Sequence, residues 1–447
     1  MNKYKIIPLA VAPLKKTVRI PGSKSYTNRA LILAALAKGE SVITGVSEGD
    51  DSVAMIKALT QLGIKVLQTG NSIKIIGNGG EFPEFKGTID VGAGGTTMRF
   101  LASLCATIEG ETILKGSERM HERPIFELVD ALRELGVKID YLQKEGCPPL
   151  KIFGQKHLGK KMMTSAKKIT NAAVVSMDGS FSSQYFTSLL LIGGLLKQDL
   201  VIKVKGEQIS RSYIDMTIDG LDDFGITVEN NNYSEYKIKS GQNYHARSYH
   251  VEGDASGASY FMAIAAINGK NDKICTIRVE NLNVKSAQGD IKFADLLERM
   301  GCSVKRGKDF IEVTGNGVLN GIDVDMELMP DTAQTLAVVA AFAKGTTRIT
   351  GLGTLKIKET DRILAVATEL GKMGITCRTG EDWIEIDGGQ PQANNIDTYK
   401  DHRMAMSFAV AGSRLEGMVI NDPDVVSKSL PEFWQLLAEL GVKHEPI

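Results

Sequence analysis

The stretch LRELGVKI (residues 132–139) decides the fold, because it joins a helix pattern to a strand pattern through one glycine. Its leucines lie three residues apart, as on one face of a helix, Gly136 suits a left-handed C-cap, and the residues after it favour a strand. The same phrase recurs as LTQLGIKV (59–66), LDDFGITV (221–228), LLERMGCSV (296–304), LGKMGITC (370–377) and LLAELGVKH (436–444). The chain therefore contains six copies of one module.

A second pattern lies 40 to 48 residues before each of these glycines. There a small or polar cluster opens onto an Ala/Leu/Met-rich run typical of a buried helix. The six copies are GSKSYTNRALILAAL from Gly22, GGTTMRFLASLCA from Gly94, SSQYFTSLLLIGG from Ser182, GDASGASYFMAIAAI from Gly253, PDTAQTLAVVAAFA from Pro330 and DHRMAMSFAVAG from Asp401. Each module thus predicts strand, helix with a polar start, strand, helix ending in glycine, then strands, which is a repeated βαβα unit of an α/β protein.

The starts of these six helices are the functionally interesting points of the predicted fold. Helix N-termini expose unpaired backbone N–H groups and a partial positive charge, so they attract anions. If the modules pack with these ends towards a common centre, a protein without net charge acquires an anion-attracting cleft.

Composition narrows the class of protein. The 447 residues are 43% apolar and 24% charged, as in soluble globular proteins, and 53 basic residues balance 53 acidic ones. No global field draws the chain to nucleic acid or to an anionic membrane, so a local cluster must hold any anionic partner. Five scattered cysteines indicate reduced thiols in a cytoplasmic protein rather than a zinc site or a disulfide framework.

No membrane span or signal peptide is expected. The longest strongly apolar run, residues 189–196, is far shorter than the roughly 20 residues that a membrane helix needs. Residues 1–16 contain lysines and an apolar stretch, but Pro8 and Pro13 interrupt it and no small-residue cleavage site follows. We interpret this segment as strand.

Basic residues stand near several helix starts, where charge-assisted bonds to phosphate or carboxylate would be strong. Examples are Lys24 and Arg29 in the first helix, Arg99 after the glycines of GAGGTTMRF (92–100), and Arg119, His121 and Arg123 in SERMHERP (117–124). A solvated helix or surface loop explains each segment about as well, and i,i+4 pairing could equally produce LKIKETDRI (355–363). Neither the dinucleotide fingerprint nor the P-loop spacing is present, so no nucleotide cofactor is expected.

Taken together, nine phrases resemble the 5-enolpyruvylshikimate-3-phosphate synthase family over nearly the whole chain. They are PGSKSYTNRA (21–30), GTTMR (95–99), ERP (122–124), DGSFSSQ (178–184), VEGDAS (251–256), PD (330–331), KETDR (358–362), DHRMAM (401–406) and DP (422–423) with Lys428. The resemblance implies two domains of three units each, an inside-out α/β barrel fold with an interdomain cleft. It implies a discontinuous domain of residues 1–23 and 251–447, with residues 24–250 inserted, and closure about crossings near Gly22 and Val251.

The resemblance also implies the substrates and their sites. Shikimate 3-phosphate would be bound by Lys24, Ser25, Arg29, Ser182, Ser183, Gln184, Ser210, Tyr213, Asp331 and Lys358. Phosphoenolpyruvate would be bound by Lys24, Gly95, Arg123, Gln184, Arg362, Arg403 and Lys428.

In the implied reaction the 5-hydroxyl of the shikimate ring adds to C2 of phosphoenolpyruvate while C3 gains a proton, and the tetrahedral intermediate then loses phosphate. A base and an acid are needed, for which we assign Asp331 as base, Glu359 to proton transfer at C3, and Lys24 as an assisting group. No cofactor and no metal are expected, and the protein is expected to be a cytoplasmic monomer that binds neither nucleic acid nor membrane.

Three positions depart from the family pattern: Ala93, Phe100 after Arg99, and Thr354 before KETDR. Gly95 is the position at which glyphosate-sensitive members keep glycine, so the resemblance implies competition between glyphosate and phosphoenolpyruvate. Phe100 makes the degree of sensitivity an open question, since it could tilt the helix that holds Gly95.

Two other readings are open. The related transferase that uses UDP-N-acetylglucosamine shares the fold and the chemistry, but it has a Lys-Asn pair near its N-terminus and usually a cysteine in a mobile loop. Here GSKS and Arg29 stand instead, and Cys105 lies in an apolar helical run. A non-catalytic repeat scaffold around nucleic acid would need a basic face across many repeats, and net neutrality counts against it.

Overall fold

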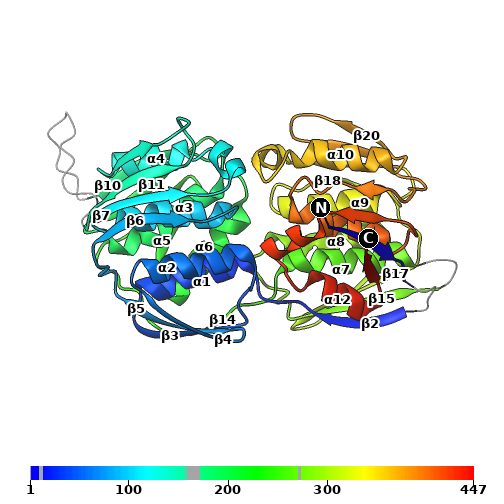
Figure 1. The fold of residues 1–447 in the computed structure, drawn as a ribbon, viewed down its shortest axis with the longest axis horizontal. Helices are drawn as coiled ribbons and strands as arrows, with labels where there is room; N and C mark the ends of the chain where they lie inside the picture. Colours follow the sequence, from blue (N-terminus) through cyan, green and yellow to red (C-terminus); the bar gives the residue numbers. More distant parts are fainter. Residues whose placement is uncertain (1, 10–13, 157, 159–171, 270–272) are drawn as a thin grey trace. The chain divides into compact units, whose positions relative to one another are not determined.

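The computed structural model describes residues 2–9, 14–156, 158, 172–269 and 273–447. The chain folds into two compact units (Figure 1). The first unit comprises residues 1–23 and 252–447, and the second comprises residues 24–251. The segments at the two crossings are hydrogen-bonded to each other, because the Ser23 N–H donates to the Glu252 carbonyl at 2.8 Å and Gly22 forms an antiparallel bridge with Gly253.

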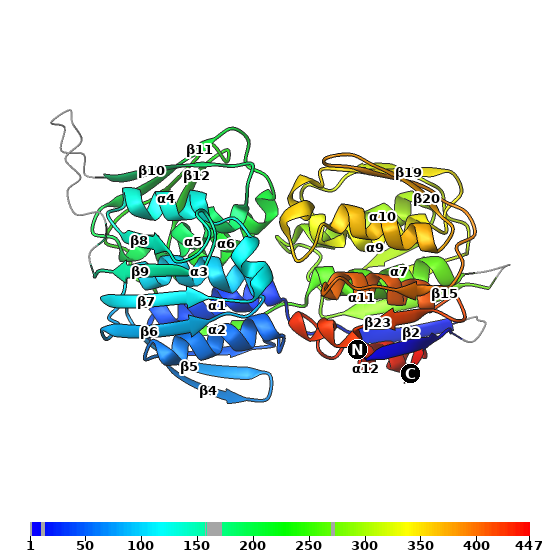
Figure 2. The same cartoon turned by 45° about the horizontal axis from the view of Figure 1, so that its top comes forward.

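The second unit contains three four-stranded sheets. In spatial order their strands are β14 (Ser248–His250), β3 (Lys38–Thr44), β5 (Ser72–Asn78) and β4 (Lys65–Thr69); β6 (Phe85–Asp90), β7 (Gly110–Lys115), β9 (Leu150–Gly154) and β8 (Lys138–Tyr141); and β10 (Ala172–Asp178), β11 (Asp199–Lys205), β13 (Glu235–Ile238) and β12 (Val228–Asn231). Figure 2 shows the second of these sheets, with β6, β7, β9 and β8 side by side.

The first unit also contains three four-stranded sheets. Their strands are β2 (Leu14–Arg19), β15 (Cys275–Glu280), β17 (Phe310–Gly315) and β16 (Ser303–Arg306); β18 (Asp323–Asp325), β19 (Thr346–Thr350), β21 (Ile384–Asp387) and β20 (Thr376–Thr379); and β22 (Asn395–Ile396), β23 (Val419–Asn421), β1 (Lys3–Ile7) and β24 (Lys443–Pro446).

All six sheets share one topology. The first strand pairs parallel with the second, and the remaining pairs are antiparallel, as in β6–β7, β7–β9 and β8–β9. Strand β1 completes the last sheet of the first unit by pairing with β23 and β24, which brings the two ends of the chain together. Strand β14, from the end of the second unit, completes the sheet that contains β3. In each unit, one sheet is thus completed by a strand from far along the chain.

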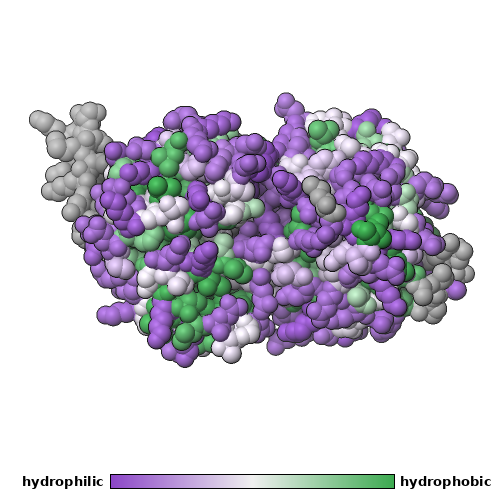
Figure 3. Space-filling model, in the orientation of Figure 1, coloured by the Kyte–Doolittle hydropathy of each residue, from purple (hydrophilic) through white to green (hydrophobic). Residues whose placement is uncertain are grey.

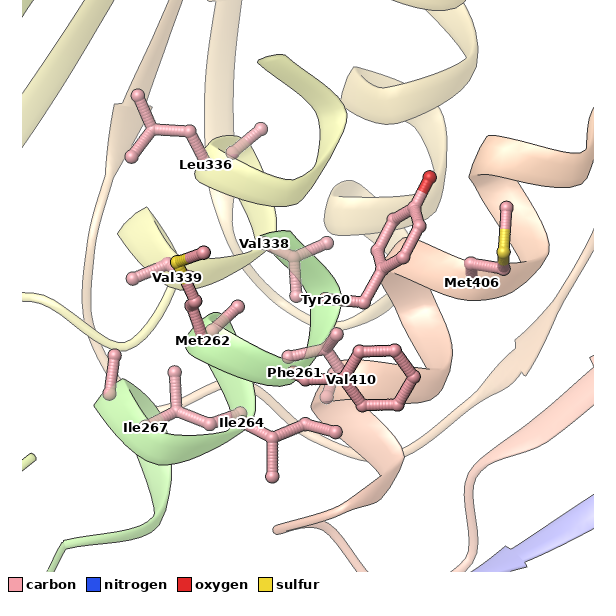
Figure 4. Packing of buried hydrophobic residues seen from close by; sticks show 14 of the residues in the cluster. Tyr260, Phe261, Met262, Ile264, Ile267, Leu336, Val338, Val339, Met406 and Val410 are labelled. Carbon is pink, nitrogen blue, oxygen red and sulfur yellow. The ribbon is translucent and has the colours of Figure 1, made fainter. Parts of the chain in front are cut away.

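A helix buried among its neighbours precedes the second strand of each sheet. These inner helices are α1 (Lys24–Leu36), α3 (Gly95–Ala106) and α5 (Ser183–Ile192) in the second unit, and α7 (Ala255–Asn268), α9 (Ala333–Ala340) and α11 (His402–Gly412) in the first. Of these helices, α3, α5, α9 and α11 each connect the two parallel strands of their own sheet. Every residue of α3 and of α11 is buried, so the sheets surround the helices instead of the reverse. Figure 4 shows side chains of α7, α9 and α11 gathered in the core of the first unit.

A second helix in each module lies further out and is only partly buried. These helices are α2 (Asp50–Gln61), α4 (Phe126–Glu134), α6 (Arg211–Asp223), α8 (Phe293–Arg299), α10 (Arg362–Lys372) and α12 (Phe433–Leu440). The repeat glycine that follows each of these helices has a positive φ, from 81° at Gly374 to 113° at Gly301. A residue with a side chain would be strained in this backbone conformation. Short 3₁₀ helices complete the structure: η1 (Glu118–Glu122), η2 (Gly193–Leu195), η3 (Gly289–Lys292), η4 (Pro330–Thr332), η5 (Gly353–Ile357) and η6 (Pro423–Lys428).

The six-module α/β prediction is confirmed, including the polar helix starts and the left-handed glycines. The segment 1–16, expected to be strand, contains β1 and the first part of β2, and its residues 1 and 10–13 lie outside the described residues. All five cysteines are free thiols. None of the described helices is both long and apolar enough to span a bilayer. On the face seen in Figure 3 most of the surface is hydrophilic, with smaller hydrophobic patches.

Candidate active site

Asp331 lies at the centre of an ion-pair network in the first unit. It sits in η4, the turn that leads into α9. Its Oδ1 accepts a hydrogen bond from Arg362 Nη1 at 3.1 Å, and its Oδ2 accepts one from Arg403 Nη2 at 2.9 Å. Lys358 Nζ lies 4.0 Å from Oδ1. The predicted base is therefore surrounded by three cations from two segments of the chain, residues 358–362 and α11.

Arg362 is the most deeply held of these cations, with 2% of its side chain exposed. It begins α10, and its Nε and Nη2 donate to the two oxygens of Asp401 at 2.7 and 3.3 Å. Nη2 also donates to Glu359 at 2.8 Å. Burial alone would lower the pKa of Arg362, but the negative charges of Asp401, Glu359 and Asp331 raise it above its usual value. Arg362 is a permanent cation that holds carboxylates in place.

Arg403 and Lys428 complete this cluster. Arg403 donates from Nη1 to the Tyr260 hydroxyl at 3.2 Å and from Nη2 to Ser256 Oγ at 3.1 Å. Burial raises the pKa of Tyr260 to about 12, so its hydroxyl stays neutral. Lys428, at the end of η6, forms an ion pair with Glu359. All six predicted residues of the first unit, Asp331, Lys358, Glu359, Arg362, Arg403 and Lys428, are thus linked in one network.

In the second unit, Arg29 is held differently. It is buried in α1, and its guanidinium donates to neutral oxygens: Thr217 Oγ1, the Ser25 carbonyl and the Tyr213 carbonyl, each at 2.9 Å. Burial lowers the pKa of Arg29 to about 10, which still leaves it protonated at neutral pH. The phenyl ring of Phe100 lies 5.4 Å from the guanidinium carbon. Predicted residues Ser25, Arg29 and Tyr213 are therefore neighbours.

Lys24 and the start of α3 form a second group in this unit. Lys24 Nζ pairs with Asp51 Oδ2 at 3.0 Å, and the Asp51 carbonyl accepts a hydrogen bond from Thr97 of α3. A Cβ atom added at Gly95 would lie 2.7 Å from Arg123 Nη1 and 2.7 Å from Arg99 Nη1. A side chain at position 95 would therefore displace the ends of Arg99 and Arg123.

The start of α5 reaches the same region. Ser182 is the N-cap and accepts a hydrogen bond from the Gln184 backbone N–H, and the Gln184 side chain donates to Thr96 Oγ1 at 3.1 Å. Ser183 is buried beside them. Ser210 precedes α6 with φ 50°, a left-handed conformation that is unusual for a residue with a side chain.

The structure also decides between the readings left open by the sequence. Arg362 is buried, so KETDR is not a solvated helix with i,i+4 pairs. In SERMHERP the two arginines differ, because Arg123 is buried whereas Arg119 is exposed and pairs with Glu122. Sequence reasoning did not assign Asp401, Asp51, Ser256 and Tyr260, which hold predicted residues in place. The signal for Asp401 and Ser256 was present in DHRMAM and VEGDAS, and Tyr260 lies in the helix pattern that starts at Gly253 but was not singled out there, whereas Asp51 stands in none of the recognised motifs.

Comparison with known proteins supplies the family. A sequence model described as EPSP synthase (3-phosphoshikimate 1-carboxyvinyltransferase) matches residues 9–437. A 3-phosphoshikimate 1-carboxyvinyltransferase of Pseudoalteromonas atlantica is 43% identical, covering 97% of this chain and 99% of that protein. One from Escherichia coli O1:K1 / APEC is 42% identical, covering 96% of this chain and 97% of that protein. A solved structure of EPSP synthase from Acinetobacter baumannii superposes with a TM-score of 0.81 at 26% identity and covers both chains fully. The chain belongs to the EPSP synthase family.

Proposed function

We propose that the protein transfers the enolpyruvyl group of phosphoenolpyruvate to the 5-hydroxyl of shikimate 3-phosphate, releasing phosphate. The observation that carries this proposal is the network in which Asp331 and Glu359 share Arg362. It supplies two carboxylates for moving protons and several cations for holding anions, which is the set that the reaction needs.

The carboxylates take the proton-transfer steps. Asp331 removes the proton of the 5-hydroxyl as its oxygen bonds to C2 of phosphoenolpyruvate, and a proton from Glu359 goes to C3. The tetrahedral intermediate then expels phosphate, which leaves with the proton that Asp331 had taken, and C3 returns its proton to Glu359 as the double bond forms again. Arg362 and Lys428 both pair with Glu359 and hold its carboxyl in position for these steps.

The cations and hydroxyls take the binding steps. We assign the phosphate and ring of shikimate 3-phosphate to Lys24, Ser25, Arg29, Ser182, Ser183, Gln184, Ser210, Tyr213, Asp331 and Lys358. We assign the phosphate and carboxylate of phosphoenolpyruvate to Lys24, Gly95, Arg123, Gln184, Arg362, Arg403 and Lys428. Arginine suits these roles because its planar guanidinium can bind phosphate or carboxylate through two parallel hydrogen bonds.

The test is phosphate release by the purified protein. It receives phosphoenolpyruvate with shikimate 3-phosphate and, separately, with UDP-N-acetylglucosamine, without added metal or nucleotide. Release with the shikimate ester alone supports the proposal. Release only with the sugar nucleotide would keep the chemistry and overturn the substrate, whereas no release with either would favour a scaffold.

Glyphosate provides a second readout of the same site. We propose that it competes with phosphoenolpyruvate, so the apparent KM for phosphoenolpyruvate should rise with inhibitor concentration while kcat stays constant. Inhibition that lowers kcat without changing this KM would contradict the proposal.

We further propose that the protein acts as a cytoplasmic monomer that binds neither nucleic acid nor membrane. Its balanced charge and predominantly hydrophilic visible surface support this proposal. A sedimentation experiment should give a single species near 48.4 kDa, and heparin should not retain it at moderate salt. A dimer or firm retention on heparin would refute the corresponding statement.

A further inference from the structure

Asp290 is a buried acidic residue of the first unit to which the proposed mechanism gives no role. It lies in η3, a short turn that packs against α7, α8 and η4. Its side chain is 5% exposed, and among the described residues nothing forms a hydrogen bond with its Oδ1 atom. Buried carboxylate oxygens are normally paired, so this one calls for an explanation.

The charged groups around Asp290 belong to the candidate active site. Asp331 approaches from η4, Arg403 from α11, and Asp254 from the N-cap of α7, whereas α8 turns buried apolar side chains towards the core. Asp254 accepts a hydrogen bond from Ser256 Oγ at 2.6 Å, and Ser256 in turn accepts one from Arg403. Asp290 therefore lies behind a continuous chain from Asp254 through Ser256 and Arg403 to Asp331.

This setting favours the protonated form of the carboxyl. Burial first, and then the negative charges of Asp331 and Asp254, raise the pKa of Asp290 to about 7, while Arg403 opposes the rise. The group is neutral in mildly acidic solution and becomes anionic as the pH passes through neutrality. Its charge thus changes over the range in which a cytoplasmic enzyme works.

That change alters the charge balance of the network. Its four cations, Lys358, Arg362, Arg403 and Lys428, face four carboxylates, Asp331, Glu359, Asp401 and, through Ser256, Asp254. With Asp290 protonated, these charges balance, whereas ionised Asp290 leaves one negative charge in excess. Because Arg403 is a cation whose charge acts on the Asp290 carboxyl, its attraction for an incoming anion falls.

We propose that Asp290 is a positioning residue that controls phosphoenolpyruvate capture, because its protonated form leaves Arg403 available to the substrate and its ionised form competes for the guanidinium. This inference rests on the proposed function. No bond forms or breaks at Asp290, since its proton only exchanges with solvent. The substrate, being an anion, favours the protonated carboxyl by linkage.

The test compares Asp290→Asn, which keeps the shape and cannot ionise, with the wild type from pH 6 to pH 8.5. At each pH the KM for phosphoenolpyruvate of the wild type is divided by that of the variant, so that titration of the substrate cancels. The ratio should be near one at pH 6 and should rise about threefold to tenfold by pH 8.5, with little change in kcat. A ratio that does not change with pH would overturn the proposal.

A matched control and a measurement without a variant complete the experiment. Glu369 is a fully buried carboxylate of the same unit that pairs with Lys372 and Tyr399, outside this network. Glu369→Gln should leave the pH dependence of KM unchanged, and a parallel change would contradict a specific role for Asp290. Should Asp290→Asn not fold, Asp290→Ser offers a second neutral side chain.

Infrared spectra of the wild type separate this inference from the proposed function, since they do not depend on turnover. A carboxylic-acid band should disappear with a midpoint near pH 7. Its absence would overturn the inference even in an active enzyme. Its presence in a protein that releases no phosphate would leave the protonated carboxyl established and the proposed function refuted.

Discussion

The two units hold their buried arginines in opposite ways. In the first unit, Arg362 donates to three carboxylates, those of Asp331, Glu359 and Asp401. In the second, Arg29 donates to a hydroxyl and two backbone carbonyls, each a neutral oxygen. Carboxylates therefore neutralise the charge of Arg362, whereas none of the hydrogen bonds seen for Arg29 within the described residues goes to a carboxylate.

The difference indicates that the two kinds of arginine site have different functions. Carboxylates fixed by cations are suited to moving protons, because their position and protonation state are set before substrate arrives. A guanidinium held by neutral oxygens keeps its charge for an anion that comes later, at the cost of being desolvated meanwhile. The lowered pKa of Arg29, against the raised pKa of Arg362, expresses this contrast. We infer that Arg29 keeps its charge for an anionic substrate, whereas Arg362 mainly fixes the carboxylates that move protons.

The largest expected effect comes from removing the carboxylate that the first unit prepares. Asp331→Ala should lower kcat for phosphate release by about 10³-fold or more, because a positioned general base contributes 10² to 10⁴ and because Arg362 and Arg403 lose a shared partner. Steady-state kinetics measure the loss, and circular dichroism confirms that the fold remains. Asp387→Asn, at an exposed aspartate paired with Arg378, is the control and should be nearly neutral. Near-normal turnover in folded Asp331→Ala would remove Asp331 from the mechanism.

The next test compares how much Arg362 and Arg29 each contribute to the stability of the folded protein. Arg362→Met should lower the free energy of unfolding by about 3–5 kcal/mol, because it leaves fully buried Asp401 without its cation. Arg29→Met should leave it within about 1 kcal/mol of the wild type or raise it, since only neutral oxygens lose a donor. Denaturant unfolding at pH 7 measures both. An equal loss of unfolding free energy in the two variants would show that the two arginines do not differ in this way.

The sign for Arg29 follows from its titration. A base whose folded pKa lies below its unfolded value favours the neutral form on folding, so its contribution to stability falls as the pH drops from the unfolded pKa to the folded pKa of about 10, and it stays unfavourable down to pH 7. Arg29→Met removes this unfavourable contribution, which offsets the loss of its hydrogen bonds. Binding of shikimate 3-phosphate should recover stability in the wild type but not in the variant.

The contrast also marks what the sequence could and could not predict. Periodic leucines and a glycine such as Gly136 are local signals, so the modules, helix starts and left-handed turns were predictable. Family phrases pointed to Arg29 and Arg362 and also contain the acidic residues Asp331, Glu359 and Asp401, but they did not show which partners each arginine takes. Thr217 lies 188 residues from Arg29 and Asp401 lies 39 from Arg362, and only folding brings each pair together. Asp290 was missed because its significance is burial beside Asp331, which no local pattern encodes.

A smaller effect tests whether the second unit acts through the position of its guanidinium groups. In Gly95→Ala the new methyl group would meet Arg123 and Arg99 at 2.7 Å, so both guanidinium groups must shift. A displacement of this kind should raise the KM for phosphoenolpyruvate about tenfold to a hundredfold, with the fold intact. Gly371→Ala, in a described helix where a Cβ meets nothing within 4 Å, is the matched control. An unchanged KM in Gly95→Ala would show that these arginines do not need their observed positions.

The smallest effect concerns how the uncompensated charge of Arg29 is tolerated. The Phe100 ring lies 5.4 Å from the guanidinium carbon, and an aromatic face attracts a cation without neutralising it. Phe100→Leu should therefore raise the KM for shikimate 3-phosphate about twofold to tenfold, because a cation–π contact contributes roughly 0.5–2 kcal/mol. The helix tilt that the sequence suggested for this position stays a prediction, and it would instead affect phosphoenolpyruvate through Gly95. Comparing the KM for shikimate 3-phosphate with the KM for phosphoenolpyruvate decides between these routes.

Phe224→Leu, at a buried phenylalanine of the same unit, controls for lost packing, since it should lower stability without changing either KM. If Phe100→Leu affects only stability, as Phe224→Leu should, then Arg29 keeps its charge without help from the ring, and neutral oxygens alone suffice to hold it.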